Sequence, residues 1–521
     1  MLGVPVRTWA VALAGLGGRL IEVQSIVLSG LPRIIVVGLP DAAIGEAADR
    51  IRAAFGSLGH ALPPHRITLN LSPVDLPKHG AGFDLAMAAA LLAVSGVIAP
   101  DAPGRAVHIG ELGLDGAVLP VAGVLPAVAA ARDAGIDTVV VPRACEHEAA
   151  LVEGVRVVAV GSLRELALHY GADVDELGPA PIETAAPTFP IRPRQPRTVP
   201  ELADVLGMEE AVRAVVIAAA GRHHLSMIGP PGSGKTMLAE RLPGILPPLS
   251  VDAAIRVAAV RSLRGYPIDS ELDRTPPFQA PHHTTTQVAL IGGGSGGRVQ
   301  PGAISLAAGG VLFLDEAPEF SRTVLDALRQ PLESGEVTIN RARSSATYPA
   351  NAQLVVAANP CPCGNAEVRG LDCGCAPSVR QRYLRRLSGP LLDRIDLQVR
   401  VQPPSVAAVR LAASGARGDL TTAAAAEQVL AARERAAARL GPLGFQLNSE
   451  VDAATLRRPE LRPAPGAAAP LDHALERALI TMRGYTRIQK TAWTIADLAG
   501  ADRPELNHIN EALWYRVGAG R

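Results

Sequence analysis

The sequence is poor in aromatic residues and cysteines, and it has no excess of charge of either sign. Phenylalanine, tryptophan and tyrosine make up 3% of the 521 residues, whereas hydrophobic residues of all kinds make up 48%. Such a chain packs its cores mainly with alanine, valine and leucine, and it is too apolar to be disordered. Lysine plus arginine and aspartate plus glutamate number 50 each, so the formal net charge is zero. Composition therefore gives no support for a nucleic-acid partner, and any such contact requires a local basic patch.

The sequence also lacks a membrane-spanning run and a secretory disulfide framework. The best apolar stretch, 86–99, is interrupted by Ser95 and Gly96 and is shorter than the roughly 18 residues of a spanning helix. The apolar part of residues 9–18 is too short for a signal peptide and reads equally well as a strand. Four of the five cysteines are clustered, which is not the pattern of a secreted disulfide scaffold. We therefore expect a cytoplasmic protein with no membrane partner.

Residues 227–236 meet the pattern G-x-x-x-x-G-K-[ST] in full, between a strand-like and a helix-like segment. In this context glycines turn backbone N–H groups inward to bind anions, and the helix N-terminus adds partial positive charge. Lys235 is expected to reach the outer phosphates of ATP, and the Thr236 hydroxyl to bind Mg²⁺. The predicted nucleotide-binding residues are Gly229, Pro230, Pro231, Gly232, Ser233, Gly234, Lys235 and Thr236. A chance match of a glycine-rich turn is the alternative, and a second motif argues against it.

That second motif is the run 311–314, four apolar residues that lead into Asp315 and Glu316. A buried parallel strand has this composition, and its C-terminal end is where an α/β sheet presents chemistry. Asp315 is expected to hold Mg²⁺, and Glu316 to orient and polarise the attacking water. The alternative is a strand followed by a solvated acidic turn.

A third apolar run, 353–358, ends in Asn359, whose amide can bond the attacking water or the terminal phosphate. Four thiols follow within fifteen residues, in two C-x-C pairs. Four thiolates suit a closed tetrahedral Zn²⁺ site. The alternative is a set of free or reversibly oxidised thiols, and the spacing alone does not decide between them. The predicted ligands are Cys361, Cys363, Cys373 and Cys375.

Before the phosphate-binding pattern, strand-like and helix-like segments alternate. Strands are expected at 21–28, 33–37 and 66–71, and helices at 42–58 and 83–94, the first capped by Asp41. Asp115-Gly116 marks a hairpin turn. The stretch from Pro77 to Ala90, the hairpin, and residues 130–135 resemble the proteolytic domain of Lon protease, which uses a Ser–Lys dyad. The serine position falls on Gly82 and the lysine position on Leu125. The resemblance therefore implies the fold without the protease activity.

Three domains and a linker are expected in this α/β chain. Residues 1–177 form a Lon-protease-like (ribosomal-protein-type) α+β domain, and 178–200 a proline-rich linker. Residues 201–404 form an AAA+ P-loop core, a parallel sheet with helices, and 405–521 a C-terminal α-helical lid. Within the lid, a second linker is expected near 459–470, and helices at 471–482 and 486–498.

The motifs, with the segment 391–396, resemble the magnesium-chelatase-like AAA+ ATPases, and with the N-terminal domain the ComM (YifB) family. The resemblance implies a homo-hexameric ring that uses ATP and Mg²⁺ to move branched or single-stranded DNA, with branch migration in recombination or natural transformation. It also implies that Asn359 is sensor 1, Arg394 the arginine finger and Arg483 the sensor 2 arginine. Relatives often have arginine where this chain has Trp493, so we assign no nucleotide role there.

Two other functions remain open. A chelatase-type remodelling ATPase acting on a protein or metal-insertion partner is the main alternative, and an ATP-dependent protease is disfavoured by Gly82 and Leu125. For the DNA motor, contacts are expected from arginines in the inserts around the sheet, near the histidine pair His282-His283 and the glycine run 292–297. These arginines are Arg261, Arg264, Arg298, Arg341 and Arg343.

Overall fold

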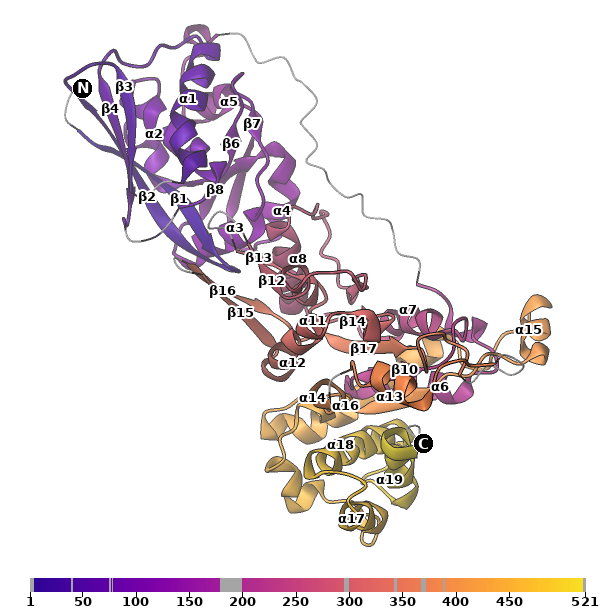
Figure 1. Cartoon of the computed structure of the whole chain (residues 1–521). Coiled ribbons are helices and arrows are strands. Elements are labelled where there is room, and N and C mark those ends of the chain that lie inside the picture. The colour runs from indigo at the N-terminus through magenta and orange to yellow at the C-terminus, as the bar shows by residue number, and fades with distance from the viewer. Residues whose placement is uncertain are drawn as a thin grey trace.

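A computed structural model describes residues 4–38, 41–74, 76, 78–178, 199–294, 299–341, 344–366, 372–387 and 389–518. Figure 1 shows three parts in a row: an N-terminal sheet at the top, a second sheet in the middle, and C-terminal helices at the bottom. Of the linker expected at 178–200, residues 179–198 lie outside the described residues. None of the described helices is both long and apolar enough to cross a membrane.

The described part of residues 4–178 contains a seven-stranded sheet in the order β3-β4-β2-β1-β5-β8-β9. β2 pairs antiparallel with both β1 and β4, and the other neighbours are parallel. The strands are β1 (Val6–Ala14), β2 (Gly17–Leu28), β3 (Arg33–Val37), β4 (Arg66–Ser72), β5 (Val107–His108), β8 (Thr138–Pro142) and β9 (Arg156–Val160). The helices are α1 (Ala42–Ser57), α2 (Asp84–Val94), α3 (Val124–Asp133), α4 (Glu146–Ala150) and α5 (Leu163–His169).

The elements expected in this part are confirmed. The predicted strands correspond to β2, β3 and β4, and the predicted helices to α1 and α2. The Asp41 carboxylate caps α1 by accepting a 2.9 Å hydrogen bond from the Ile44 amide. On either side of Asp115-Gly116, β6 (Glu111–Leu112) pairs antiparallel with β7 (Val118–Leu119). Local patterns were sufficient here because each element carries its own periodicity and turn residues.

The middle part is built on a sheet of five parallel strands, counted over its described residues, in the order β11-β14-β17-β10-β18. These are β10 (Leu225–Ile228), β11 (Phe278–Gln279), β14 (Val311–Leu314), β17 (Gln353–Ala358) and β18 (Leu397–Arg400). Phe313 packs into a core with α6 (Glu209–Gly221) and α7 (Lys235–Ile245) on one face. Leu312 and Leu314 pack into a second core with α10 (Ala303–Leu306) and α11 (Arg322–Ala327) on the other. Burial of both faces explains why these strands are continuous apolar runs.

Two inserts extend from this sheet toward the N-terminal part. One is the hairpin of β15 (Glu336–Arg341) and β16 (Ser344–Pro349), and the other pairs β12 (Gly292–Gly293) with β13 (Gln300–Pro301). The turn between β1 and β2 lies against β16: a side chain at Gly15 would approach the Thr347 carbonyl to 3.0 Å. The remaining helices of this part are α8 (Val251–Leu263), α9 (Gln287–Ile291), α12 (Arg329–Ser334), α13 (Pro377–Leu384) and α14 (Gly389–Leu392).

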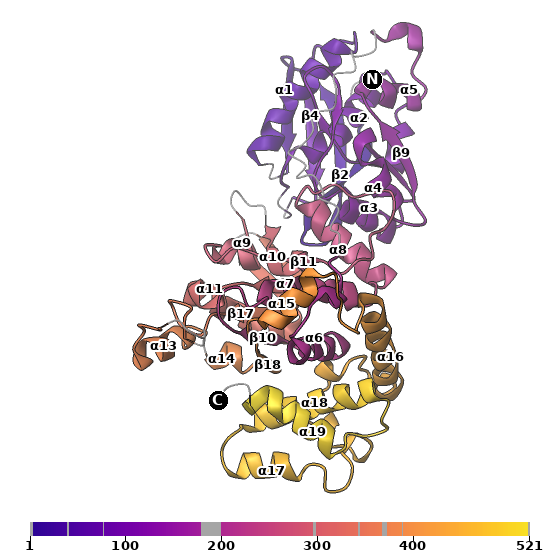
Figure 2. The same cartoon turned by 90° about the vertical axis from the view of Figure 1, so that its right-hand side faces the viewer.

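A second contact fixes the N-terminal part on the middle part. Val124, Leu125 and Val128 of α3 share one core with Ala258 and Ala259 of α8. At the same place the Gly123 amide donates to the Ser262 carbonyl (3.1 Å). Figure 2 shows α3 and α8 side by side at this junction. The contact is apolar and hydrogen-bonded, so it holds the two parts in a defined orientation.

The C-terminal helices follow the parallel sheet, and those after residue 420 share a core with α6 and α7. They are α15 (Val406–Ala413), α16 (Thr422–Leu440), α17 (Ala469–Glu476), α18 (Met482–Ala499) and α19 (Leu506–Leu513). The helix expected over 471–482 is confirmed only to Glu476, where α17 ends, because Ala478 has a φ of +54° and Thr481 caps a new helix through the Gly484 amide. The linker expected near 459–470 is wrong. Leu461 is buried and the Ala464 amide donates to the Pro504 carbonyl (2.9 Å), so this proline-rich stretch is folded onto the helices.

Trp493 of α18 is a core residue, consistent with the absence of an assigned nucleotide role. The side chain is 2% exposed, its indole N–H donates to the Leu461 carbonyl (3.0 Å), and the Arg439 guanidinium lies 4.0 Å above its ring. Arg439 also pairs with the buried Asp497. Trp493 therefore holds α16, α18 and the 459–470 segment together.

We expect Trp493→Ala to destabilise the C-terminal helices by roughly 3–5 kcal/mol, because it empties a large buried volume. Hydrogen exchange of α16 and α18 amides in the full chain measures the loss as reduced protection. Trp514→Ala is the matched control: Trp514 is 52% exposed, and its removal should cost about 0.5 kcal/mol. Equal protection in both variants would contradict the core role of Trp493.

Candidate functional site

The predicted phosphate loop has the strand–loop–helix geometry that anion binding requires. Residues 229–234 connect β10 to α7, and Gly234 caps α7 with a left-handed backbone (φ +88°). Gly229 cannot carry a side chain, because a Cβ there would lie 2.1 Å from the Val401 carbonyl oxygen. The first amides of α7 therefore face the loop and provide donors and partial positive charge for an anion.

Lys235 is the cation of this loop. Its Nζ donates to the carbonyls of Gly229 (2.7 Å) and Pro230 (2.9 Å) and to Asn359 Oδ1 (3.3 Å). Burial lowers the pKa of Lys235, and the charges of Asp315 and Glu316 act in the opposite direction. The amine is thus held between the phosphate loop and the end of β17, where it can reach the outer phosphates of a nucleotide.

Thr236 and Asp315 meet across the edge of the sheet. The Thr236 hydroxyl donates to Asp315 Oδ2 (2.8 Å), although the two residues are 79 positions apart in the sequence. A hydroxyl and a carboxylate at one point are the oxygen ligands that Mg²⁺ prefers, so the residues present fit this ion. Held by Thr236 and Asp315, Mg²⁺ would neutralise part of the charge that develops on the phosphates.

Glu316 is presented in an unusual backbone conformation. Its φ is +49°, a left-handed value that is uncommon for a residue other than glycine. The carboxylate lies at the end of β14 and pairs with His283 Nδ1 (3.3 Å). His283 was not assigned to the nucleotide site from the sequence. The structure places it beside the residue predicted to orient water, and the signal was a histidine pair between the two motifs.

The other two strand ends complete one edge of the sheet. β17 pairs in parallel register with both neighbours, Ala358 with Ile228 of β10 and Val356 with Leu314 of β14. Asn359 therefore follows β17 next to the phosphate loop, on the same edge as Asp315. All four sequence-predicted positions of the central site, Lys235, Asp315, Glu316 and Asn359, meet at this edge.

Arg394 lies away from the phosphate loop, near the C-terminal helices. Its side chain is 11% exposed and forms an ion pair with Glu333 at the end of α12. The Arg487 guanidinium of α18 donates to the Arg394 carbonyl (3.1 Å) and pairs with Asp396. Glu333 and Arg487 were both missed from the sequence, because neither belongs to a motif and both are brought near by packing.

Arg483 lies in the same region as Arg394. It is 57% exposed in its side chain and, within the described residues, pairs with Asp393 (3.9 Å) and not with the loop 229–236. The buried Arg516 also approaches Asp393 (3.9 Å). The two predicted arginines therefore share one end of the protomer, and neither contacts the phosphate loop of its own described chain.

The four clustered cysteines converge on one point. Their Sγ atoms all lie within 4.8 Å of one another, and Cys361 is fully buried. The separations of Cys361 from Cys363 and Cys373 are 3.3 and 3.6 Å, and that between Cys363 and Cys373 is 3.6 Å. These distances are too long for a disulfide bond, and all five cysteines are free. Cys145 is buried in the N-terminal part, far from the cluster in sequence.

The arginines expected to contact DNA lie around the inserts where they are described. Arg264 donates to Gln300 of β13 (3.0 Å), and Arg341 is exposed at the end of β15. Arg261 pairs with Asp273 (3.7 Å). Arg298 and Arg343 lie outside the described residues. Arg341 therefore places positive charge on one insert, and Arg264, which follows α8, places it against the other.

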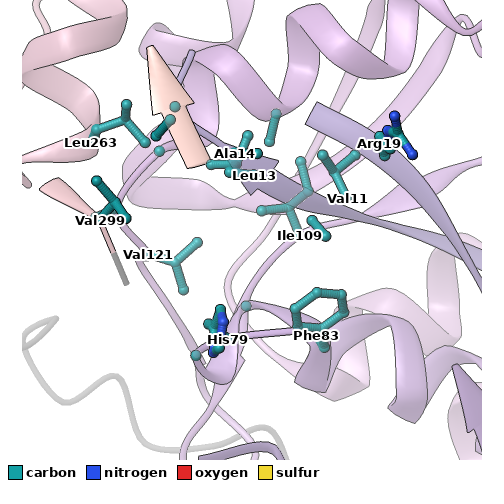
Figure 3. Close-up of a pocket in the computed structure, with 18 of the residues that line it drawn as sticks. Val11, Leu13, Ala14, Arg19, His79, Phe83, Ile109, Val121, Leu263 and Val299 are labelled. Atoms are coloured by element: carbon teal, nitrogen blue, oxygen red, sulfur yellow. The ribbon is translucent and has the colours of Figure 1, made fainter. Parts of the chain in front are cut away.

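A cavity of about 460 Å³ lies between the N-terminal part and the inserts. Figure 3 shows Leu13, His79, Phe83 and Val121 around it on the N-terminal side and Val299 from the middle part. Gly82 also lines this cavity. Leu125 is buried against α8, with its amide donating to Glu148 (2.9 Å). The two positions that the resemblance to Lon protease assigns to the dyad thus carry no nucleophile and no base.

Family models match along most of the chain. The model described as magnesium chelatase, subunit ChlI, matches residues 201–409, and the one for its C-terminal part matches 419–516. A third model, described as subunit ChlI of Mg-chelatase, matches residues 21–145. With the fold and the site, these matches define a magnesium-chelatase-like AAA+ ATPase.

Relatives extend over the whole length. An uncharacterized protein of Mycobacterium tuberculosis is 45% identical over 516 residues, covering 99% of both chains. Competence protein ComM of Haemophilus influenzae is 39% identical, and YifB of Escherichia coli is 38% identical. Each of these two alignments covers 97% of this chain and 96% of the relative. The chain belongs to the ComM/YifB family of magnesium-chelatase-like proteins.

We expect Lys235→Ala and Glu316→Gln to impair ATP hydrolysis in different ways. The first removes a charge at the phosphates, so ATP affinity should fall roughly 10- to 100-fold together with turnover. The second leaves Thr236 and Asp315 in place but removes the carboxylate, so turnover should fall about 10²-fold or more while ATP stays bound. Nucleotide-binding titrations and single-turnover hydrolysis separate the two effects. Wild-type turnover in the Gln variant would show that Glu316 does not orient the water.

Proposed function

We propose that this protein is an ATP-hydrolysing ring motor that acts on DNA in the cytoplasm, with branch migration or helicase activity in recombination or natural transformation. The observation that carries the proposal is the meeting of Lys235, Asp315, Glu316 and Asn359 at one sheet edge, in a chain related over its whole length to a protein named for competence. ATP and Mg²⁺ are the substrate and cofactor, bound by residues 229–236 and Asp315.

The separation of the two halves of the site supports the proposal of a ring. Arg394 and Arg483 lie on a different end of the protomer from the phosphate loop, and a guanidinium near the γ-phosphate is worth several kcal/mol to hydrolysis. A neighbouring copy can bring both arginines to the loop. A closed ring, which we propose to be a hexamer, gives every loop such a neighbour. In that arrangement Arg394 acts as the finger and must leave its pair with Glu333.

The DNA path is proposed to run along the inserts. Arg264 contacts β13 through Gln300, and Arg341 is the last residue of β15. The two inserts pack together, since a side chain at Gly292 of β12 would meet Ile339 of β15 at 2.6 Å. A ring repeats these charges, which compensates for the zero net charge of the chain. The N-terminal part contacts β16, so we propose that it guides DNA to the inserts. We further propose that it has the Lon-type fold without the dyad.

A remodelling ATPase that acts on a protein or metal-insertion partner is the second candidate. It is favoured by the descriptions of the three matching models, all of which name a magnesium chelatase subunit. The two candidates differ in one property, since only the motor requires DNA binding.

We expect Arg264→Glu combined with Arg341→Glu to abolish DNA-stimulated hydrolysis and leave basal hydrolysis intact. Each lost phosphate contact should reduce the slope of log affinity against log salt by about one unit. The charge-matched control is Arg477→Glu with Arg503→Glu, exposed positions in the C-terminal helical part, which has no proposed DNA contact. Normal binding by the insert variant would refute this DNA path, and no DNA binding by the wild type at low salt would favour the remodelling ATPase.

We expect Arg394→Ala subunits to regain activity when mixed with Lys235→Ala subunits. Lys235→Ala damages the phosphate loop on one side of an interface, and Arg394→Ala removes the finger on the other side. Mixed rings therefore contain some interfaces with both residues, whereas rings of either variant alone contain none. The finger is worth on the order of 10³ in rate, so even a small fraction of intact interfaces is measurable. Native mass spectrometry confirms co-assembly. Absence of recovery in proven mixed rings would mean that Arg394 does not act across the interface.

A further inference from the structure

The four sulfurs of Cys361, Cys363, Cys373 and Cys375 have the spacing of ligands around one ion. Thiolates about 2.3 Å from a tetrahedral centre lie roughly 3.8 Å from each other. The separations of 3.3–3.6 Å among three of the sulfurs, and the 4.8 Å limit over all four, approach this value. The cysteines of a multi-iron cluster bind different iron ions and lie farther apart. The geometry therefore fits a single metal ion.

The chemistry of the ligands selects the ion. Four thiolates without a histidine or carboxylate form a soft, closed set, which is typical of structural Zn²⁺ and leaves no position for a reacting water. On binding, the thiols release their protons to solvent and the ion takes four thiolates. No redox step is involved.

The cysteine segment is joined directly to the nucleotide site. Cys361 comes two residues after Asn359, whose amide oxygen accepts from Lys235 Nζ (3.3 Å). The Gly364 amide closes a turn onto the Cys361 carbonyl (3.0 Å), and Gly364 has a φ of +79°. A side chain on Gly364 would lie 2.6 Å from the Pro231 ring, so the backbone of this turn packs on the phosphate loop.

The C-terminal end of the cysteine segment leads through α13 and α14 to Arg394. Arg380 of α13 donates to the Cys375 carbonyl (3.0 Å), and α14 follows before Arg394. Arg386, between these helices, pairs with Glu319 (3.4 Å), three residues after Glu316. The cluster thus lies between the two segments whose positions matter for hydrolysis.

We propose that the four cysteines bind one Zn²⁺, and that this ion fixes the turn 361–364 against Pro231 and so positions Asn359 and the phosphate loop. The cysteines are positioning residues, since they act through Asn359 and Pro231 and touch no substrate. The positioning of Asn359 and the phosphate loop by zinc rests on the ATPase activity proposed above, whereas zinc binding itself does not.

The test begins with metal content. The full chain, purified without metal-affinity resin, should contain about one zinc per chain by elemental analysis. Cys373→Ser with Cys375→Ser should contain almost none. Cys363→His should retain the metal, because imidazole is also a zinc ligand and this side chain is exposed. Cys145→Ser is the matched control, a cysteine outside the cluster, and should retain one zinc.

The same variants test the coupling. Loss of zinc should lower ATP affinity or turnover roughly 10-fold, while Cys363→His and Cys145→Ser should stay close to wild type. If the serine variant fails to fold, a chelator removes zinc from the wild type, and activity should fall and then return when Zn²⁺ is added back. ATP affinity, measured with a fluorescent analogue, gives this readout even if hydrolysis is absent.

Three results would overturn the proposal. A zinc-free wild type with four titratable thiols, or a serine double variant with wild-type zinc, removes the metal site. Zinc loss with unchanged ATP affinity and turnover removes the coupling alone. A wild type that binds zinc and ATP but neither hydrolyses ATP nor responds to DNA contradicts the proposed function instead, and leaves the metal site standing.

Discussion

The parallel register of three strands determines the chemistry of this protein. β17 lies between β10 and β14 and pairs with both, so the residues that follow the three strands meet at one edge. That edge joins the Thr236 hydroxyl to Asp315 across 79 positions of sequence and brings Asn359 to Lys235. Because both faces of the sheet are buried, a shift of register would expose apolar residues on either side. The two cores therefore stabilise the fold and, through it, the geometry of the nucleotide site.

At the end of the protomer away from the phosphate loop, arginines and aspartates form a network of ion pairs. Arg394, Arg483, Arg487 and Arg516 gather around Asp393 and Asp396, and three of them come from the C-terminal segment after residue 480. Burial opposes the ionised form of Asp396, but the neighbouring His223, whose Nδ1 lies 3.5 Å from Oδ2, and the charge of Arg487 outweigh it and lower its pKa. His223 precedes β10, so this network connects the C-terminal helices to the strand that carries the phosphate loop.

Local patterns predicted most elements and the centre of the site. The phosphate loop, the acidic strand end and the N-terminal strands each depend on residues that are close in sequence. Glu333 and Arg487 could not be found in this way, because each is brought to its partner by packing between distant segments. His283 stands out as half of a histidine pair, but its position beside Glu316 depends on packing. The break between α17 and α18 was missed since it depends on a left-handed Ala478, a conformation that composition does not indicate. The 459–470 stretch was taken for a linker because its proline content suits both a linker and short turns packed on helices.

The claim that ATP hydrolysis serves DNA movement is tested most directly with a four-way DNA junction. The measurement is the rate of ATP hydrolysis by the full wild-type chain at low salt, with and without the junction, followed by the rate at which the junction is resolved into duplexes. We expect the junction to stimulate hydrolysis and to be resolved only when ATP is hydrolysed. A hydrolysis rate that junction, forked and single-stranded DNA all leave unchanged, with the junction intact, would contradict the DNA motor.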